Sequence, residues 1–418
     1  RHIPVRGHAS MQVMDGPASP PFEINPACFD LTDTDPADDR DAEKAMVSLR
    51  QVLYMLRPSQ EHTDMMPPPS AFIPKDDNMP SLNPTHIDDE RWQHGFAFVD
   101  EAREVRIHYI DCPPEGKQER GTVLLIHGYP NTSYQWRHVI TPISNAGYRV
   151  IAPDYRGAGD SSHPRSGYDK VTVADDLYKV AMTILVRVAS AARPFPSSLS
   201  FSTPLSGSLH AHRLTDTLRA ITSKIHVVGQ DIGGMIAHAY AASHPDHTRS
   251  VMWGECPLPG STPYESGFKN SPGMWHFTFQ QQLDLPEMLT QGKEKIYIKH
   301  FYDRLCFNPA GIGPRDVDHY GASFCQPGAM RAGFDLYRAF PQDAKDNQAM
   351  LKRDGQLNIP SAALSGEMSL LREVAMDQTK EFYTQAAEVI VARSGHWTAE
   401  ENPASFVEGV VSFIKKHD

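Results

Sequence analysis

The sequence predicts an α/β fold, a doubly wound and mostly parallel sheet with a helical cap. Four short apolar segments have the texture of buried parallel strands: 123–127, 148–152, 224–229 and 250–253. Helical patterns lie between or after them, beginning at Ser133, spanning 172–186 and beginning again near Gly234. Strands that alternate with helices at this spacing are typical of a doubly wound sheet.

Further strands and a cap complete the predicted fold. Alternating segments at 96–99 and 105–110 predict an antiparallel pair, and 360–366 and 387–392 have strand texture late in the chain, before a last helix at about 404–416. The stretch from about 260 to 341 has a mainly helical pattern. The predicted domains are therefore a first core segment, a helical cap and a second core segment: 91–260, 261–341 and 342–418.

Two segments are predicted to lie outside this compact fold. Residues 1–90 are rich in proline and acidic clusters, so they predict an extension that is largely disordered. One amphipathic helix is expected at 42–57, docked on the body of the protein or on a partner. Residues 186–212, rich in Ser, Pro and Ala, predict a disordered insertion or a gene-model artefact without a catalytic role.

Composition narrows the classes of partner. The formal net charge is −11 and the basic residues do not form runs, which argues against nucleic acid or an anionic membrane as the main partner. No apolar run reaches the 18 residues expected of a membrane span. Five widely spaced cysteines suggest no disulfide framework and favour a reducing compartment, the cytoplasm. The first residue is Arg, so we expect the true N-terminus, with any targeting peptide, to lie before it.

The strongest chemical signal is Asp231, in a turn between Gly229 and Gly233 that joins a strand to a helix. This pattern is typical of a nucleophile elbow, in which small flanking residues allow a tight turn. A carboxylate is ionised at neutral pH and can displace a leaving group from sp³ carbon, with an enzyme ester as the product. The alternative is an ordinary glycine-rich turn in which the Asp caps the helix.

A second motif predicts an oxyanion hole. His127, Gly128, Tyr129 and Pro130 follow a predicted strand directly. In this arrangement the backbone N–H of Tyr129 supplies one donor, and the N–H of Ile232, next to the nucleophile, supplies the other.

The general base and its acid come from later in the chain. His396 follows the last predicted strand and precedes the last helix, so we expect it to activate the water that hydrolyses the ester. Glu255 and Glu367 each follow a core strand, and either could orient the imidazole. The alternative for each Glu is a solvated carboxylate at a strand end.

Residues 92–418 resemble the epoxide hydrolases and related dehalogenases of the α/β-hydrolase superfamily. Four motifs carry the resemblance: 127–130, 154–161, 229–234 and 395–397. In one branch of this family the acid lies in a Glu-x-Pro-x-Pro setting like that of Glu255, so the resemblance favours Glu255 over Glu367. The same branch has a His and a Tyr in the cap that hold the epoxide oxygen, and these correspond to His276 and Tyr337. Both could instead be packed cap residues.

The resemblance implies hydrolysis of an epoxide to a vicinal diol, with two alternatives. A hydrolytic dehalogenase would use the same Asp, His and acid. However, Ile232 stands where haloalkane dehalogenases have a Trp, and Ile232 and Met235 stand where fluoroacetate dehalogenases have arginines. The other alternative is a non-catalytic binding protein of the same fold.

The expected substrate is a small apolar epoxide. Aromatic residues in the cap segment indicate an apolar pocket: Trp275, Phe277 and Phe279. No cofactor or metal is expected, because no His/Cys cluster has ligand spacing and the Asp mechanism requires none. The sequence leaves the oligomeric state open.

Overall fold

The computed structural model describes residues 90–102, 104–116, 119–191 and 223–418. The predicted extension, with its helix at 42–57, lies outside the described residues apart from Glu90. Most of the predicted insertion also lies outside them. Among the described residues, no helix combines the length and the apolar character that a membrane crossing requires.

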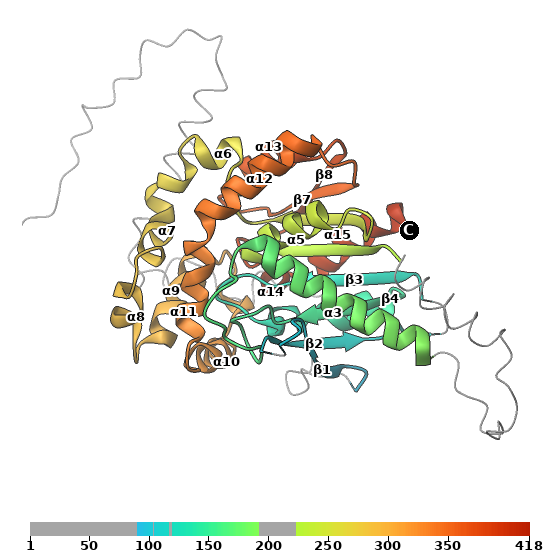
Figure 1. Ribbon diagram of the computed structural model, residues 1–418, viewed down its shortest axis with the longest axis horizontal. Coiled ribbons are helices and arrows are strands. Elements are labelled where there is room, and N and C mark those ends of the chain that lie inside the picture. Colours follow the sequence, from blue (N-terminus) through green and yellow to red (C-terminus); the bar gives the residue numbers. More distant parts are fainter. Residues whose placement is uncertain (1–89, 103, 117–118, 192–222) are drawn as a thin grey trace, which may run out of the picture. The chain divides into compact units, whose positions relative to one another are not determined.

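A single eight-stranded sheet forms the centre of the described fold (Figure 1). In spatial order its strands are β1 (Gln93–Phe98), β2 (Arg106–Cys112), β4 (Tyr148–Pro153), β3 (Gly121–Ile126), β5 (Ile225–Gln230), β6 (Thr248–Gly254), β7 (Ser361–Gly366) and β8 (Ala386–Val391). The pairs β1–β2 and β2–β4 are antiparallel and all other pairs are parallel. The predicted mostly parallel sheet is therefore confirmed.

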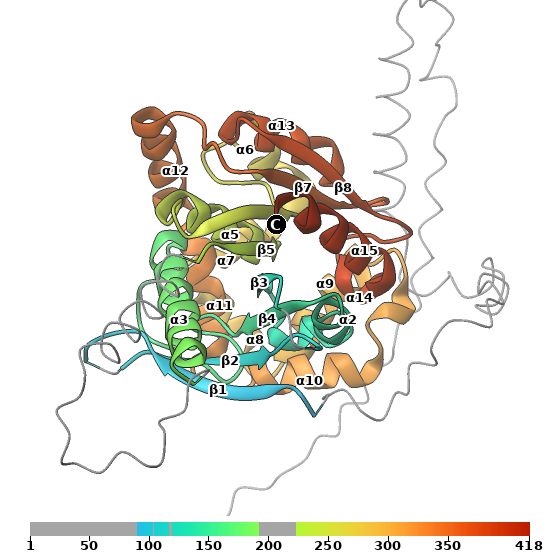
Figure 2. The same ribbon diagram turned by 90° about the vertical axis from the view of Figure 1, so that its right-hand side faces the viewer.

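Helices cover both faces of the sheet, as Figure 2 shows. On one face lie α3 (Lys170–Ala191) and α5 (Ile232–Ser243), and on the other lie α2 (Ile140–Asn145) and α15 (Pro403–Ile414). Neighbouring residues of one strand serve opposite faces: Leu124 belongs to the core cluster with α3 and α5, whereas Val123 and Leu125 belong to the cluster with α2 and α15. This alternation explains why consecutive residues of β3 are apolar.

The region between β6 and β7 is helical and lies at the left of Figure 1. Its elements are α6 (Thr262–Glu265), η4 (Phe268–Asn270), η5 (Pro272–Met274), α7 (Trp275–Gln280), α8 (Leu285–Thr290), α9 (Glu294–Leu305), η6 (Pro309–Gly311), α10 (Pro314–Phe324), α11 (Ala329–Arg338) and α12 (Phe340–Asp354). The predicted cap boundary at 341 falls inside α12, which runs on to Asp354, and it stays a prediction.

The remaining helices lie in the core segments. Helix η3 (Ser133–Trp136) follows β3, α13 (Arg372–Phe382) follows β7, and α14 (Thr398–Glu401) and η7 (Lys415–His417) follow β8. Two predicted boundaries are wrong. Helix α3 extends to Ala191, so residues 186–191 are helical rather than part of an insertion, because Leu185 and Val188 still pack against the core. Helix α5 begins at Ile232, two residues before Gly234, because the chain turns at Asp231.

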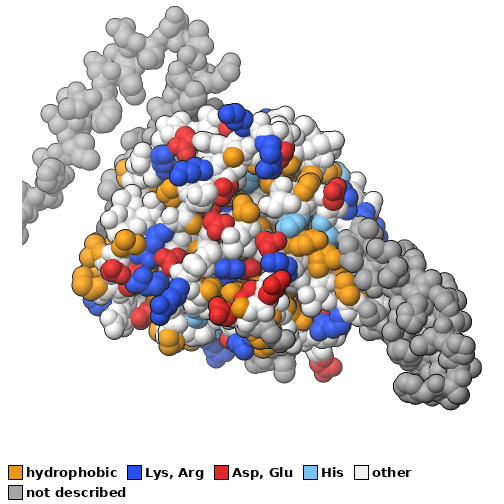
Figure 3. Space-filling model, in the orientation of Figure 1, with side chains coloured by type: hydrophobic (Ala, Val, Ile, Leu, Met, Phe, Trp, Pro, Cys, Tyr) orange, Lys and Arg blue, Asp and Glu red, His pale blue; other side chains and the backbone are white. Residues whose placement is uncertain are grey.

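The surface in Figure 3 carries acidic and basic side chains side by side. Apolar side chains gather at its left edge, over α8. Three residues of this helix are exposed and apolar: Leu285, Met288 and Leu289. Helix α8 therefore presents apolar side chains to solvent at the outer side of the cap.

Candidate active site

The predicted catalytic side chains converge at the carboxyl ends of the parallel strands. Asp231 follows β5, Tyr129 follows β3, Glu255 follows β6 and His396 follows β8. Strands β3 and β5 are neighbours, although β4 comes between them in the chain. Such a reversal of strand order opens the sheet edge where α/β proteins bind ligands.

The turn at Asp231 depends on its flanking glycines. Asp231 has φ of 58° and ψ of −130°, an uncommon conformation for a residue with a side chain. A Cβ on Gly233 would collide with the carbonyl oxygens of Ile126 and His127, at the end of β3. A Cβ on Gly128 would lie 2.6 Å from the Asp231 Cβ. The elbow can therefore press against β3 only because these positions lack side chains.

The two oxygens of the Asp231 carboxylate have different surroundings. The backbone N–H of Tyr129 donates to Oδ1 at 2.8 Å, and the N–H of Ile232 also hydrogen-bonds the carboxylate. Oδ2 lies 3.6 Å from His396 Nε2. Burial raises the pKa of Asp231, and although His396 and the two N–H groups oppose this, the pKa stays above its usual value. Backbone N–H therefore holds Oδ1, while Oδ2 faces the imidazole.

His396 is bonded to Glu255 on its other side. Its Nδ1 lies 3.0 Å from Glu255 Oε2, and Glu255 is fully buried. Glu255 also accepts hydrogen bonds from the N–H of Gly366 at 2.8 Å and from Ser369 Oγ at 2.6 Å. Burial lowers the pKa of His396, but the Glu255 hydrogen bond and the charges of Asp231 and Glu255 outweigh it, so the pKa is raised.

Glu367, the alternative acid, has a different environment. It is exposed, and its Oε2 accepts a hydrogen bond from the backbone N–H of Arg393 at 2.8 Å. The hydrogen bond to the His396 imidazole comes from Glu255 instead. The structure thus joins Asp231, His396 and Glu255 and leaves Glu367 at the surface.

The two predicted cap residues lie beside the oxyanion loop. The ring of Tyr337 on α11 lies 5.5 Å from that of Tyr129 and 5.8 Å from that of His276 on α7. Burial, with the charge of Asp231 next, raises the pKa of Tyr337 well above its usual value. Burial and the neighbouring His396 and His300 lower the pKa of His276 to about 3. Near neutral pH, both side chains are therefore uncharged hydrogen-bond donors.

The cap aromatics that predicted an apolar pocket differ in their surroundings. Trp275 is 44% exposed on α7. Phe277 is buried, with its ring 5.1 Å from Phe340 and 5.7 Å from Tyr337, so it is a packing residue of the cap. The centre of the Phe279 ring lies 6.0 Å from the centre of the Tyr297 ring.

Comparisons with known proteins agree with the fold. A protein-family model described as the alpha/beta hydrolase fold matches residues 121–186. A soluble epoxide hydrolase of Corynebacterium sp. is 25% identical over 318 residues, which cover 74% of this chain and 93% of that protein. Epoxide hydrolase A of Mycobacterium tuberculosis is 25% identical over 327 residues, covering 74% and 94%.

Solved structures have the same fold. The crystal structure of Cfl2 from Burkholderia cenocepacia matches with a TM-score of 0.63 at 26% identity, over 78% of this chain and 98% of that one. The chain has the fold of the α/β-hydrolase superfamily. The prediction of an enzyme of this superfamily is thereby confirmed. The epoxide hydrolase CorEH, at 22% identity and a TM-score of 0.60 over 78% and 99% of the two chains, supports the fold.

Two residues to which the sequence patterns assigned no role, Glu401 and Gln230, hydrogen-bond the backbone at His396. Glu401 accepts hydrogen bonds from the backbone N–H groups on both sides of His396, those of Gly395 and Trp397, each at 3.0 Å. Gln230 bonds the His396 carbonyl oxygen through Nε2 and accepts from Gln135 Nε2 at 2.9 Å. The only sequence signal was position: Gln230 precedes Asp231, and Glu401 follows His396 by five residues.

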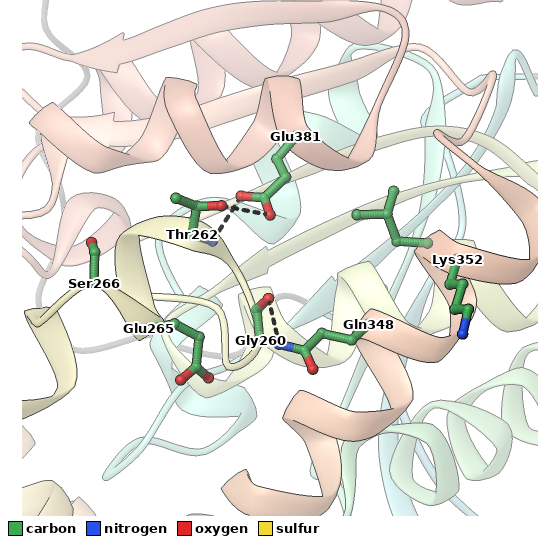
Figure 4. Close-up of a pocket in the computed structure, with 8 residues that line it drawn as sticks. Gly260, Thr262, Glu265, Ser266, Gln348, Lys352 and Glu381 are labelled. Carbon is green, nitrogen blue, oxygen red and sulfur yellow. Dashed lines mark hydrogen bonds between the residues drawn. The ribbon is translucent and has the colours of Figure 1, made fainter.

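A surface hollow of this α/β-hydrolase lies apart from the elbow, between α6, α12 and α13 (Figure 4). Its polar groups bond one another: Glu381 accepts from Thr262 N at 2.8 Å and from Thr262 Oγ1 at 3.1 Å. Gln348 Nε2 donates to the carbonyl oxygen of Gly260 at 3.4 Å. None of the predicted catalytic residues lines it.

Proposed function

We propose that this α/β-hydrolase opens a small-molecule epoxide to a vicinal diol through a covalent ester on Asp231. One observation carries the proposal: Asp231 occupies the elbow with one oxygen bonded to the Tyr129 N–H and the other facing His396. A carboxylate in this position suits attack on sp³ carbon. The relatives named epoxide hydrolases, at about 25% identity, support this choice of substrate class.

In the first step, Asp231 Oδ2 attacks an epoxide carbon. A bond forms between that carbon and Oδ2, and the ring C–O bond breaks. Tyr337 and His276 donate hydrogen bonds to the epoxide oxygen, whose negative charge grows as the ring opens. Because the pKa of Tyr337 is raised, its hydroxyl holds its proton until the alkoxide forms.

In the second step, His396 takes a proton from water, and the water oxygen attacks Cγ of the Asp231 ester. The carbonyl oxygen at Oδ1 becomes an oxyanion. The N–H of Tyr129 already bonds Oδ1 and the N–H of Ile232 bonds the same carboxylate, so these two groups stabilise the new charge. The bond from Cγ to Oδ2 then breaks, and the imidazolium gives its proton to Oδ2, which leaves as a hydroxyl of the diol. The second proton of the water balances the one taken up by the alkoxide of the first step. Glu255 stabilises the imidazolium that forms.

Oxygen labelling tests this route. In a single turnover in ¹⁸O-water with enzyme in excess, we expect a largely unlabelled diol, because its new oxygen comes from Asp231. Asp231→Ala should form no diol and serves as the control. Full entry of label into the diol during that turnover would exclude the ester intermediate. The purified protein should also be tested on haloalkanes and haloacids, since halide release without diol formation would favour a dehalogenase.

A further inference from the structure

The side chain of Tyr129 contains a hydroxyl with an unmet hydrogen-bonding capacity. The residue is buried, and among the described residues no group hydrogen-bonds its hydroxyl. Leaving a buried polar group unpaired costs about 1–3 kcal/mol, and native proteins rarely leave one so. The role of Tyr129 in the proposed mechanism uses only its backbone N–H, so it does not account for this hydroxyl.

A second unpaired polar atom lies in the adjoining part of the cap. Gln280, on the same helix α7 as His276, is fully buried and donates from Nε2 to the Tyr297 hydroxyl at 2.8 Å. Its Oε1 has no partner among the described residues. The phenol of Tyr297 is in turn close enough to Tyr129 to raise the pKa of the Tyr129 hydroxyl, after the larger effect of burial. Unused hydrogen-bonding groups thus occur on Tyr129 and on Gln280, which bonds Tyr297.

The rings around Tyr129 decide what kind of group could meet its hydroxyl. Its ring contacts three others edge-on: Phe301 at 6.2 Å, Phe324 at 5.4 Å and Tyr337 at 5.5 Å. The carboxylate that acts on its pKa is that of Asp231. Aromatic rings and an adjacent carboxylate would make the burial of an anion costly. A neutral donor or acceptor fits these surroundings better.

We propose that the substrate carries a neutral hydrogen-bonding group, such as a hydroxyl, ether or carbonyl, and that the Tyr129 hydroxyl binds it. This rests on the proposed epoxide opening and specifies its substrate class. The backbone N–H of Tyr129 bonds the nucleophile, and its hydroxyl lies at the far end of the same side chain. We therefore expect the recognised group to be several bonds away from the carbon that Asp231 attacks.

Matched epoxides test this inference. In 5,6-epoxyhexan-1-ol and 1,2-epoxyheptane, a terminal hydroxyl replaces a methyl group at the same chain length. We expect the ratio of kcat/KM for the alcohol over the hydrocarbon to fall roughly threefold to tenfold in Tyr129→Phe, as loss of one neutral hydrogen bond implies. For glycidol and 1,2-epoxybutane, whose polar group lies next to the ring, the ratio should change less.

Tyr383→Phe is the control, because Tyr383 is equally buried but its hydroxyl is bonded to His238 at 2.9 Å. Its ratio for the long pair should equal that of the wild type. An unchanged ratio in Tyr129→Phe would overturn the inference, and the hydroxyl would then hold only water.

A binding measurement separates this inference from the proposed function. Hexane-1,2,6-triol and heptane-1,2-diol correspond to the two diol products and need no turnover. We expect the affinity ratio of triol over diol, from intrinsic fluorescence titration, to fall about threefold to tenfold in Tyr129→Phe. If the wild type opens no epoxide, the proposed function fails, whereas an equal affinity ratio in both proteins contradicts the role of Tyr129.

Discussion

Asp231, which is partly buried, and Glu255, which is fully buried, are both carboxylates with positive φ, yet their hydrogen bonds suit them to different roles. Glu255 is bonded through both oxygens, to Gly366, Ser369 and His396. Asp231 has Oδ1 bonded to backbone and Oδ2 directed at the imidazole. A nucleophile needs a free lone pair, and an orienting acid needs a fixed position.

Substitution of the two candidate acids should separate them. We expect Glu255→Gln to slow hydrolysis of the enzyme ester by roughly 10²- to 10⁴-fold, because the imidazolium loses its counter-ion. Glu367→Gln should change the rate less than about twofold, since that carboxylate is exposed and bonded to backbone. Mass spectrometry of quenched reactions would measure the accumulated ester. Equal effects, or the reverse order, would overturn the assignment of Glu255.

The raised pKa of His396 predicts a pH effect that depends on Asp231. Burial lowers this pKa, but the combined effect of Glu255 and the charge of Asp231 raises it by more than burial lowers it. In Asp231→Asn the negative charge is absent, so we expect the pKa of His396 to fall. NMR titration would compare the two proteins, with His396→Gln identifying the signal. The same pKa in both would show that Asp231 has no influence.

This effect also gives the sign of the activity profile. Alkylation neutralises Asp231, so the pKa of His396 should be lower in the ester than in the free enzyme. Ester hydrolysis needs neutral His396 and is lost as the pH falls through that lower value. We therefore expect its acid limb, from single-turnover rates, to lie below the pKa of His396 in the free enzyme.

At the scale of elements, the site depends on how closely β3, β5 and α5 approach one another. Ala is normally more favourable than Gly inside a helix, by about 1 kcal/mol. At Gly233 the opposite should hold, because the added Cβ would collide with backbone carbonyls at the end of β3, which cannot move independently of the sheet.

We therefore expect Gly233→Ala to lower the free energy of unfolding by more than about 4 kcal/mol. The control is Gly292→Ala in the cap, where φ is +72° and nothing lies within 4 Å of an added Cβ. This variant should lose only about 1–2 kcal/mol, from backbone strain. Urea denaturation would measure both, and similar losses would contradict the close packing inferred for the elbow.

In the α/β-hydrolase as a whole, buried polar contacts join the cap to the core. Tyr302 of α9 donates to the carbonyl oxygen of Pro130 in the oxyanion loop at 2.8 Å. Tyr320 of α10 donates to the buried Glu400 at 2.8 Å. Lys170, at the start of α3, bonds Asp343 of α12 at 2.7 Å and the carbonyl oxygen of Leu336, next to Tyr337. The cap is therefore part of the architecture that positions the site.

A double-mutant cycle tests the Lys170–Asp343 contact. Each of Lys170→Met and Asp343→Leu should destabilise the fold by about 3–5 kcal/mol, because each leaves a buried partner unpaired. The double variant should lose less than the sum of the single losses. Lys299→Met breaks an exposed pair with Asp303 and should cost under about 1 kcal/mol. Additive losses in urea denaturation would show that the two residues are not coupled.

Several features could be inferred from the sequence because they are local. The strand order along the chain, the elbow at Asp231 and the HGxP motif at Tyr129 each depend on a few adjacent residues. Patterns of that kind report backbone conformation and burial. The helix ends at Ala191 and Ile232 were missed, because packing of Val188 and the backbone turn at Asp231 decide them.

Local spacing was thus sufficient for the fold class and for the position of the turn at Asp231. It could not distinguish Glu255 from Glu367, because both follow a core strand, and only the folded chain reveals which carboxylate is buried against His396. Nor could it indicate Glu401, or the unpaired hydroxyl of Tyr129. These features depend on contacts between segments far apart in the chain, which form only when the sheet and the cap are assembled.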